Sequence, residues 1–280
     1  RKKRNSGSTT ENITKIKKQI QAERKIEVIK KPGNDQMGGK TDFKETDTGK
    51  TEVIRAEIKK AEPEKEQTKF RSAIVLAGGK GRRMGKVEKA LLEFEGKTIL
   101  EHLLESLFRV VDEVIISFRD KKQEEKFRPV LEKFPAREIR FCFDTLEDAG
   151  PLEGIRAGLL ESRAEYSFVC AGDMPFVDSR VVDLLFEKAI GYDAALPKRE
   201  DGKFEPLHAV YSKKMISEIE KVFKNGRRSV LTPVFEMEDV VFVEVSEIKE
   251  FDPELMTFAN INTVDDIQHF IELSSKKEKS

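Results

Sequence analysis

The sequence predicts an α/β protein with an open, mostly parallel, doubly wound (Rossmann-like) sheet and a disordered N-terminal extension. From residue 70 onward, short apolar runs alternate with stretches of helical periodicity, which is typical of strand–helix–strand units in a parallel sheet. The first 69 residues have a different composition. Only two of the 22 aromatic residues, Phe43 and Phe70, fall within the first 70 positions.

The N-terminal extension, residues 1–69, is polar and basic. Residues 1–70 contain 19 Lys and Arg against 12 Asp and Glu, although the whole chain of 280 residues has a formal net charge of zero. A stretch with so few aromatic side chains cannot bury enough apolar surface to offset its ordering entropy. We therefore predict disorder there, with a short helix over 11–31 as the one candidate element, and a single folded domain over 70–280.

Composition also bears on partners and location. The basic cluster at residues 1–4 has no interleaved aromatic residues on which bases could stack, so we expect a solvated tail and no nucleic-acid binding. No apolar run approaches the roughly 18 residues of a membrane span, and no CxxC or HExxH spacing indicates a zinc site. Cys142 and Cys170 lie within apolar runs, as expected for buried thiols of a cytoplasmic protein.

Apolar runs mark the expected strands. Several are rich in β-branched or aromatic residues and end at a glycine, serine or aspartate. The expected strands are 73–77, 114–116, 140–143, 166–171, 193–197, 207–211 and 240–245.

Apolar residues three and four positions apart mark the expected helices. These are 99–110, 121–134, 150–159, 178–185, 216–223 and 263–271. Pro151 suits a first helical turn, where its missing N–H is harmless, and Asp178 suits an N-cap. Pro129 is a candidate break within the second helix.

A glycine or a polar residue follows each of four expected strands. These residues are Gly78, Ser117, Asp144 and Asp173. In an open parallel sheet the carboxyl ends of neighbouring strands share one edge, and ligands bind there. We therefore expect a glycine loop and two carboxylates to converge on one crevice.

The glycine loop lies in residues 76–92, which read LAGGKGRRMGKVEKALL. Its glycines include Gly78, Gly79 and Gly81, and its cations include Arg82, Arg83 and Lys89. Glycines let backbone N–H groups approach an anion closely, and guanidinium and ammonium groups bind phosphate oxygens. This combination predicts a polyphosphate-binding loop.

Two common phosphate-binding motifs do not fit this loop. The P-loop pattern GxxxxGK[ST] fails because the glycine interval is wrong and Val87 follows Lys86. The dinucleotide pattern GxGxxG, started at Gly79, requires glycine where Met84 stands. The remaining pattern is LAGGxxxRMGxxK.

This pattern resembles the signature of the molybdenum cofactor guanylyltransferase family, within the nucleotidyltransferase superfamily. Further segments are similar to that family: Gly-Pro-Leu-x-Gly at 150–154, Gly-Asp-x-Pro at 172–175 and Asn-Ile-Asn-Thr at 260–263. The resemblance covers about Ser72 to Phe270. It implies a nucleotidyltransferase-type fold and transfer of GMP from GTP to the phosphate of molybdopterin (molybdenum cofactor), with release of pyrophosphate and formation of the guanine dinucleotide.

The resemblance also implies roles for particular residues. The expected catalytic residues are Arg82, Arg83, Lys89 and Asp173. The expected nucleotide-binding residues are Leu76, Ala77, Gly78, Gly79, Gly81, Lys89, Ser117, Asp144 and Asp173. The expected acceptor-binding residues are Arg227, Arg228 and Asn262. Asp173 is the expected ligand of Mg²⁺, since this hard cation takes a carboxylate together with substrate phosphates.

Several alternatives remain open. Ser117 stands where the family often has asparagine, which leaves a cytidylyltransferase for the same acceptor as a rival. A sugar-phosphate nucleotidyltransferase is a second rival among related enzymes. A non-catalytic nucleotide-binding module with a partner-binding tail is the rival of another class. A lone histidine between apolar residues is usually structural, so we favour that interpretation of His208 over a catalytic base. Molybdoenzymes or insertion proteins that receive the product are candidate partners.

Overall fold

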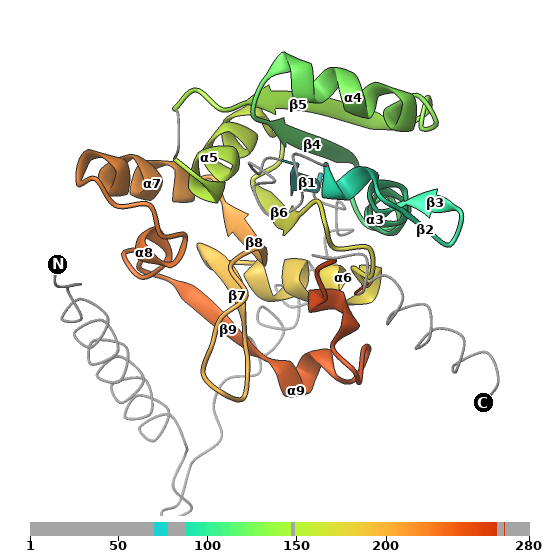
Figure 1. Cartoon of the computed structure of the whole chain (residues 1–280). Coiled ribbons are helices and arrows are strands. Elements are labelled where there is room, and N and C mark those ends of the chain that lie inside the picture. Colours follow the sequence, from blue (N-terminus) through green and yellow to red (C-terminus); the bar gives the residue numbers. More distant parts are fainter. Residues whose placement is uncertain (1–69, 78–87, 147–148, 262–265, 267–280) are drawn as a thin grey trace, which may run out of the picture. The chain divides into compact units, whose positions relative to one another are not determined.

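The computed structural model describes residues 70–77, 88–146, 149–261 and 266 (Figure 1). Three expectations lie outside these residues: disorder over 1–69 with its candidate helix at 11–31, the glycine loop from Gly78 to Gly81, and a C-terminal helix beginning at 263. Within the described residues no helix is long and apolar enough to cross a membrane.

The core of the described domain is a seven-stranded sheet, with strand order β5-β4-β1-β6-β8-β7-β9. The strands are β1 (Ser72–Leu76), β4 (Glu113–Phe118), β5 (Glu138–Phe143), β6 (Tyr166–Ala171), β7 (Ala194–Lys198), β8 (His208–Ser212) and β9 (Val240–Glu244). Strand β8 pairs antiparallel with β6 and β7, whereas the other four pairings are parallel. The predicted mostly parallel sheet is confirmed.

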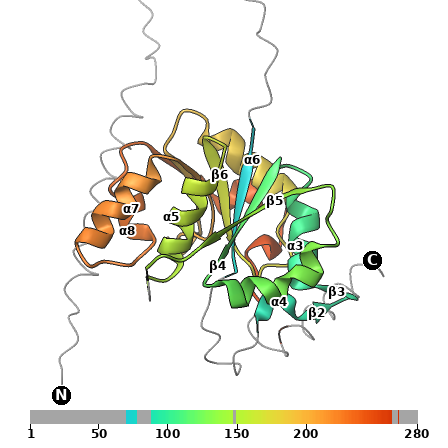
Figure 2. The same cartoon turned by 90° about the horizontal axis from the view of Figure 1, so that it is seen from above.

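Helices cover both faces of this sheet, as Figure 2 shows. One face carries α3 (Ile99–Leu107), α4 (Lys121–Leu131), α6 (Ser179–Ala189) and the short α9 (Val245–Ile248). The other carries α5 (Pro151–Glu161), α7 (Met215–Lys224) and α8 (Leu231–Val234). A separate apolar core fills the space on each side, so the doubly wound arrangement is also confirmed.

The structure differs from the sequence-based expectation in several short elements. A hairpin of β2 (Glu93–Phe94) and β3 (Lys97–Thr98) precedes α3. Thr98 caps that helix in a reciprocal capping box with Glu101, a Thr-x-x-Glu signature that is readable from sequence.

Helix α4 is continuous, so the candidate break at Pro129 is not seen. Proline removes one intrahelical hydrogen bond, which leaves the carbonyl of Glu125 without that donor. Glu125 and Pro129 both lie on the exposed face, where water can satisfy the carbonyl. The opposite face buries Phe127 in the core.

Helix α5 packs unusually close to the centre of the sheet. An added Cβ at Gly158 would stand 2.5 Å from Cγ2 of Ile74, a fully buried residue of β1. At Gly154 it would stand 2.8 Å from Oγ of Ser117 and 2.9 Å from Cδ2 of Leu76. Because neither glycine has a side chain, α5 can lie directly over β1 and the end of β4.

Gly158→Ala is expected to lower the free energy of unfolding by about 1–3 kcal/mol, the usual effect of overpacking a core. Ile74 cannot move away from the new methyl group, because it is fully buried in the central strand. Urea denaturation measures the change. Leu160→Ala is the matched control, since Leu160 is 55% exposed on the same helix. If both variants unfold at the same urea concentration, this packing argument is wrong.

Candidate active site

The candidate site lies where the chain changes direction across the sheet. From β1 the chain proceeds to β4 and β5 on one side, and then crosses to β6 on the other side of β1. In such sheets ligands bind beyond the carboxyl ends of the strands at this point. The backbone N–H of Ala77 donates to the Ser117 carbonyl (3.1 Å), and that of Gly172 donates to the Leu76 carbonyl (3.0 Å). The ends of β1, β4 and β6 are therefore fixed side by side.

Lys89 and Asp173 meet at this edge. The Lys89 ammonium lies 3.4 Å from Oδ2 of Asp173, and the two side chains are 27% and 23% exposed. Burial raises the pKa of Asp173, and the positive charge of Lys89 partly offsets that increase. Lys89 opens the 3-10 helix η1 (Lys89–Leu91), and Asp173 follows β6. Two residues 84 positions apart are thus brought together as a charged pair.

The residues around Asp173 fit a magnesium ion that shares its coordination with substrate. Among the described residues, no group of three or more His, Cys, Asp or Glu could hold a metal by itself. Mg²⁺ in nucleotide sites commonly uses one or two carboxylates, with phosphates and waters as its other ligands. A single partly exposed carboxylate beside a lysine matches that type of site.

Asp144 directly follows β5 on the same edge. Its backbone N–H donates to the Phe118 carbonyl (3.0 Å), which ties it to the end of β4. Burial and, next in size, the negative charge of Glu153 raise the pKa of Asp144 to about 6, while the positive charge of Arg119 opposes the increase. A carboxylate that is partly buried without full compensation is typical of a binding site.

Glu153 supports the loop that carries Asp144. It is fully buried in the first turn of α5, where its carboxylate accepts hydrogen bonds from the backbone and hydroxyl of Thr145 (3.0 and 2.7 Å). Arg156 binds the same carboxylate through two nitrogens, each at 2.8 Å. Burial alone would raise the pKa of Glu153, but these bonds outweigh it and lower that pKa. Glu153 therefore stays charged and holds Thr145 in place.

Ser117 lies beneath α5. Its side chain is 2% exposed, and its Oγ would be 2.8 Å from a Cβ at Gly154. The backbone carbonyl of Ser117 accepts a hydrogen bond from the backbone N–H of Ala77, just after β1. In this structure the hydroxyl therefore packs against the helix, and the expected nucleotide contact stays a prediction.

The C-terminal part of the domain is bonded to the Asp173 loop. The backbone N–H of Ile261 donates to the Asp173 carbonyl (2.9 Å), and that of Asp178 donates to the Thr257 hydroxyl (3.1 Å). Asn262 lies outside the described residues, but its neighbour Ile261 is thereby held at the Asp173 loop.

His208 is a core residue. It is fully buried, with its ring edge-on between Phe168 and Phe258, at 4.9 Å from each ring centre. Burial lowers its pKa to about 3, and its Nε2 lies 3.1 Å from the Thr257 hydroxyl. This arrangement favours the structural interpretation over a catalytic base.

The other predicted site residues divide into two groups. The glycines of the loop, Arg82 and Arg83 lie outside the described residues. Arg227 and Arg228 are exposed just after α7, on the α5 side of the sheet. The structure therefore joins Leu76, Ala77, Lys89 and Asp173 at one point, with Asp144 on the same edge.

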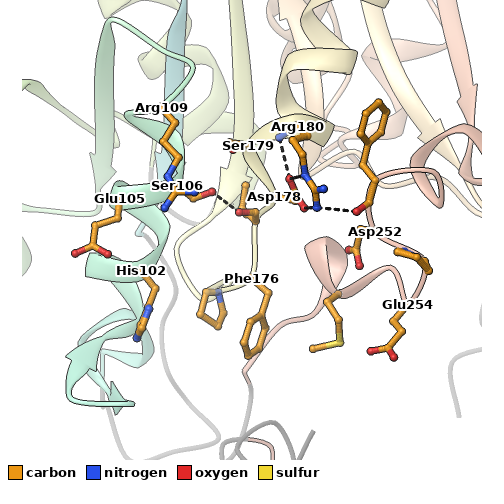
Figure 3. A pocket seen from close by; sticks show the side chains of 15 residues that line it. His102, Glu105, Ser106, Arg109, Phe176, Asp178, Ser179, Arg180, Asp252 and Glu254 are labelled. Carbon is orange, nitrogen blue, oxygen red and sulfur yellow. Dashed lines mark hydrogen bonds and ion pairs between the residues drawn. The ribbon is translucent and has the colours of Figure 1, made fainter. Parts of the chain in front are cut away.

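A groove of about 670 Å³ lies on the other side of the sheet (Figure 3). Helix α3 forms one wall with His102, Glu105 and Arg109, and the segment 251–256 forms the opposite wall. Its floor includes Pro175 and Phe176, which follow Asp173 closely in the chain. Arg180 in this groove is bound to the Asp178 carboxylate and to the Phe251 carbonyl.

Four residues near the carboxyl ends of the strands were not predicted from the sequence: Glu88, Arg119, Gln123 and Glu153. Arg119 was detectable, because it directly follows β4, whose end faces the crevice. Gln123 has no comparable signal, since a glutamine inside a charged helix reads as a surface residue. Only its burial and its long-range hydrogen bonds reveal a role.

Comparison with known proteins agrees with the sequence motifs. A family model described as "MobA-like NTP transferase domain" matches residues 73–240. A relative from Methanosarcina mazei, named probable molybdenum cofactor guanylyltransferase, is 73% identical over 219 residues, which cover 78% of this chain and 98% of the relative. A relative of the same name from Methanosarcina acetivorans is 78% identical over 206 residues, which cover 73% and 92%.

A solved structure shares the architecture. Molybdopterin-guanine dinucleotide biosynthesis protein A from Archaeoglobus fulgidus superposes with a TM-score of 0.60 at 34% sequence identity. The match covers 73% of this chain and 99% of that chain. The similarity thus extends over nearly the whole of that protein.

The raised pKa of Asp144 predicts a specific pH dependence of stability. Above pH 6 the folded state holds an unfavourable charge, so Asp144 lowers wild-type stability as pH rises from about 4 to about 6. Asp144→Asn removes this titration, so the variant should gain stability relative to wild type between pH 4.5 and 7.5. Urea denaturation of both proteins at pH 4.5 and at pH 7.5 measures this change in relative stability.

Asp201→Asn is the matched control for this experiment. The pKa of Asp201 is lowered, mainly by a hydrogen bond from Lys203, so its carboxylate favours the folded state above pH 4. Between pH 4.5 and 7.5 this carboxylate is largely ionised in both the folded and the unfolded state, so the stability difference between the control variant and wild type should stay nearly constant. If Asp144→Asn behaves like Asp201→Asn, the raised pKa of Asp144 is wrong.

Proposed function

Because the chain belongs to the family of MobA-like NTP transferases and is a nucleotidyltransferase, we propose that it transfers GMP from GTP to the phosphate of molybdopterin. Pyrophosphate is released and the guanine dinucleotide form of the cofactor results. The observation that carries this proposal is the Lys89–Asp173 pair at the direction change of the sheet. The names of its relatives from Methanosarcina support the choice of GTP and of the molybdenum cofactor.

In the proposed reaction the acceptor's own phosphate is the nucleophile. One of its oxygens forms a bond to the α-phosphorus of GTP. The bond between that phosphorus and the oxygen that bridges the α- and β-phosphates breaks. Pyrophosphate leaves with the bonding electrons. No protein nucleophile is required, so the contribution of the chain is positioning and charge stabilisation.

Lys89 and Asp173 have complementary tasks in this scheme. Without substrate they neutralise each other across 3.4 Å. With GTP bound, Lys89 would bind phosphate oxygens of the leaving pyrophosphate, and Asp173 would hold Mg²⁺. When bound, the ion supplies positive charge to the phosphate oxygens. The roles proposed for Arg82, Arg83 and the loop glycines rest on the sequence motif alone.

Asp144 is the proposed determinant of the nucleotide. As a carboxylate it only accepts hydrogen bonds, and the N1–H and 2-amino groups of guanine offer two donors side by side. Ribose hydroxyls are the other donors that could reach it. Arg119 and Glu153 adjust the charge of Asp144, and Glu153 holds the adjoining Thr145. A cytidylyltransferase for the same acceptor would keep the mechanism and change this contact.

Two places are available for the acceptor. We propose the exposed basic residues Arg227 and Arg228, with Asn262, as its binding residues. The groove between α3 and the segment 251–256 is the rival site, because its floor adjoins the Asp173 loop. The product would pass from either site to a molybdoenzyme or an insertion protein. The cytoplasm is the proposed location, supported by two buried free thiols, Cys142 and Cys170.

Asp173→Asn is expected to reduce GTP-dependent turnover with molybdopterin and Mg²⁺ by roughly 10²–10³-fold, as for comparable transition-state contacts. Turnover is measured as pyrophosphate release and by mass spectrometry of the dinucleotide product. CTP is tested in parallel with GTP. Asp183→Asn is the control. Asp183 also pairs with a cation, but that cation, Arg71, stands before β1, at the opposite end of the strand from the candidate site. Wild-type preference for CTP would identify the cytidylyltransferase, and binding of GTP without pyrophosphate would contradict the proposal.

The double variant Arg227→Ala/Arg228→Ala is expected to raise the KM for molybdopterin about tenfold or more, since each contact involves a charged group. The KM for GTP should stay at the wild-type value. Lys221→Ala is the control, because Lys221 is an exposed residue of α7 paired with Glu218. If Arg109→Ala raises the acceptor KM and the double variant does not, the acceptor binds in the α3 groove.

A further inference from the structure

Gln123 is a fully buried amide near the start of α4. Its Nε2 donates to the Ala77 carbonyl at 2.9 Å and to Oε2 of Glu88 at 2.8 Å. Its Oε1 accepts from the backbone N–H of Arg119 at 2.8 Å. One side chain thus connects the end of β1, the segment before η1 and the end of β4.

This set of contacts uses both donors of the amide. A carboxamide carries two N–H donors and one carbonyl acceptor, and all three groups have partners here. A carboxylate at the same position could not donate to the Ala77 carbonyl, and a lysine would be a buried cation. Because buried polar groups that lose a partner are destabilised, the arrangement depends on glutamine.

The two partners of Nε2 flank residues 78–87. Ala77 is the residue before that segment, and Glu88 is the residue after it and the N-cap of η1. The Glu88 carboxylate is 11% exposed and also binds Lys126 at 3.0 Å. Lys89 follows Glu88 directly, so the position of Glu88 determines where the Lys89 ammonium can reach.

We infer that Gln123 is a positioning residue, which holds Glu88 against the end of β1 and thereby places Lys89 beside Asp173. The inference deepens the proposed function, since it assigns to an α4 residue the placement of the cation for the GTP phosphates. Gln123 itself contacts no reacting group. It acts through Glu88 and the Ala77 carbonyl.

The test compares wild type with Gln123→Met, which keeps the side-chain length and removes both donors. Amine labelling with acetic anhydride, followed by mass spectrometry, reports the accessibility of Lys89. Lys133 is the internal reference, because its ion pair is with Glu101 and not with Glu88 or Asp173. The ratio of Lys89 to Lys133 labelling is expected to rise several-fold. The KM for GTP is expected to rise about tenfold, the effect of losing a hydrogen bond to a charged group, with the acceptor KM unchanged.

Glu124→Gln is the matched control. Glu124 is the next residue of α4, is 6% exposed and binds Arg128 at 2.8 Å, so its loss perturbs the same helix. It should leave the labelling ratio and both KM values unchanged. In a Glu88→Ala background, Gln123→Met should add little, since Gln123 acts largely through Glu88.

The outcomes separate this inference from the proposed function. An unchanged labelling ratio in Gln123→Met overturns the inference, whatever the kinetics show. A loss of kcat with both KM values constant would indicate a general structural role and would also overturn it. A raised ratio in a protein that shows no transfer from GTP would leave Gln123 as the residue that positions Lys89 and would reject the proposed function.

Discussion

The parallel pairing of β1 with both of its neighbours is the constraint on which the rest of the structure depends. All five residues of β1 are buried, and Leu76 lies opposite Ser117 of β4 and Ala171 of β6. This register brings three strand ends to one level. Whatever follows those strands must lie at the same edge, and Gly172 permits a close approach because a Cβ there would be 3.3 Å from the Leu76 carbonyl. Asp173 is therefore placed by backbone pairing.

The buried carboxylates of the sheet differ in how far hydrogen bonds and cations compensate their burial. At the amino edge, burial alone would raise the pKa of Glu113, but hydrogen bonds from Ser72 and Arg163 outweigh it and hold that pKa below its usual value. At the carboxyl edge, Thr145 and Arg156 compensate Glu153 in the same way. Burial prevails, by contrast, for Asp144 and Asp173, whose pKa values are raised. A buried carboxylate that lacks enough hydrogen-bond donors or nearby positive charge can be stabilised by a bound metal ion or by the N–H groups of a nucleobase.

The sequence predicted the fold, and it predicted which strand ends meet at the candidate site. Apolar runs report burial on both faces, so the expected strand at 166–171 has the bounds of β6, and the ends of the others differ by only a few residues. Asp173 was predictable because it combines a strand end with a local motif. Gln123 and Glu88 were not, because their roles arise from contacts 46 and 35 positions apart. Local pattern contains no information about such pairings, nor about the groove between α3 and residues 251–256.

The most direct test of the account is the binding of Mn²⁺ in the presence of GTP, followed by electron paramagnetic resonance. Mn²⁺ shares the preference of Mg²⁺ for carboxylate and phosphate oxygens. The account predicts tight, GTP-dependent Mn²⁺ binding by the wild-type protein, and its loss in Asp173→Asn while GTP itself still binds. Retention of wild-type Mn²⁺ affinity in that variant would contradict the account, because the carboxylate that β6 delivers to the site would then not hold the metal.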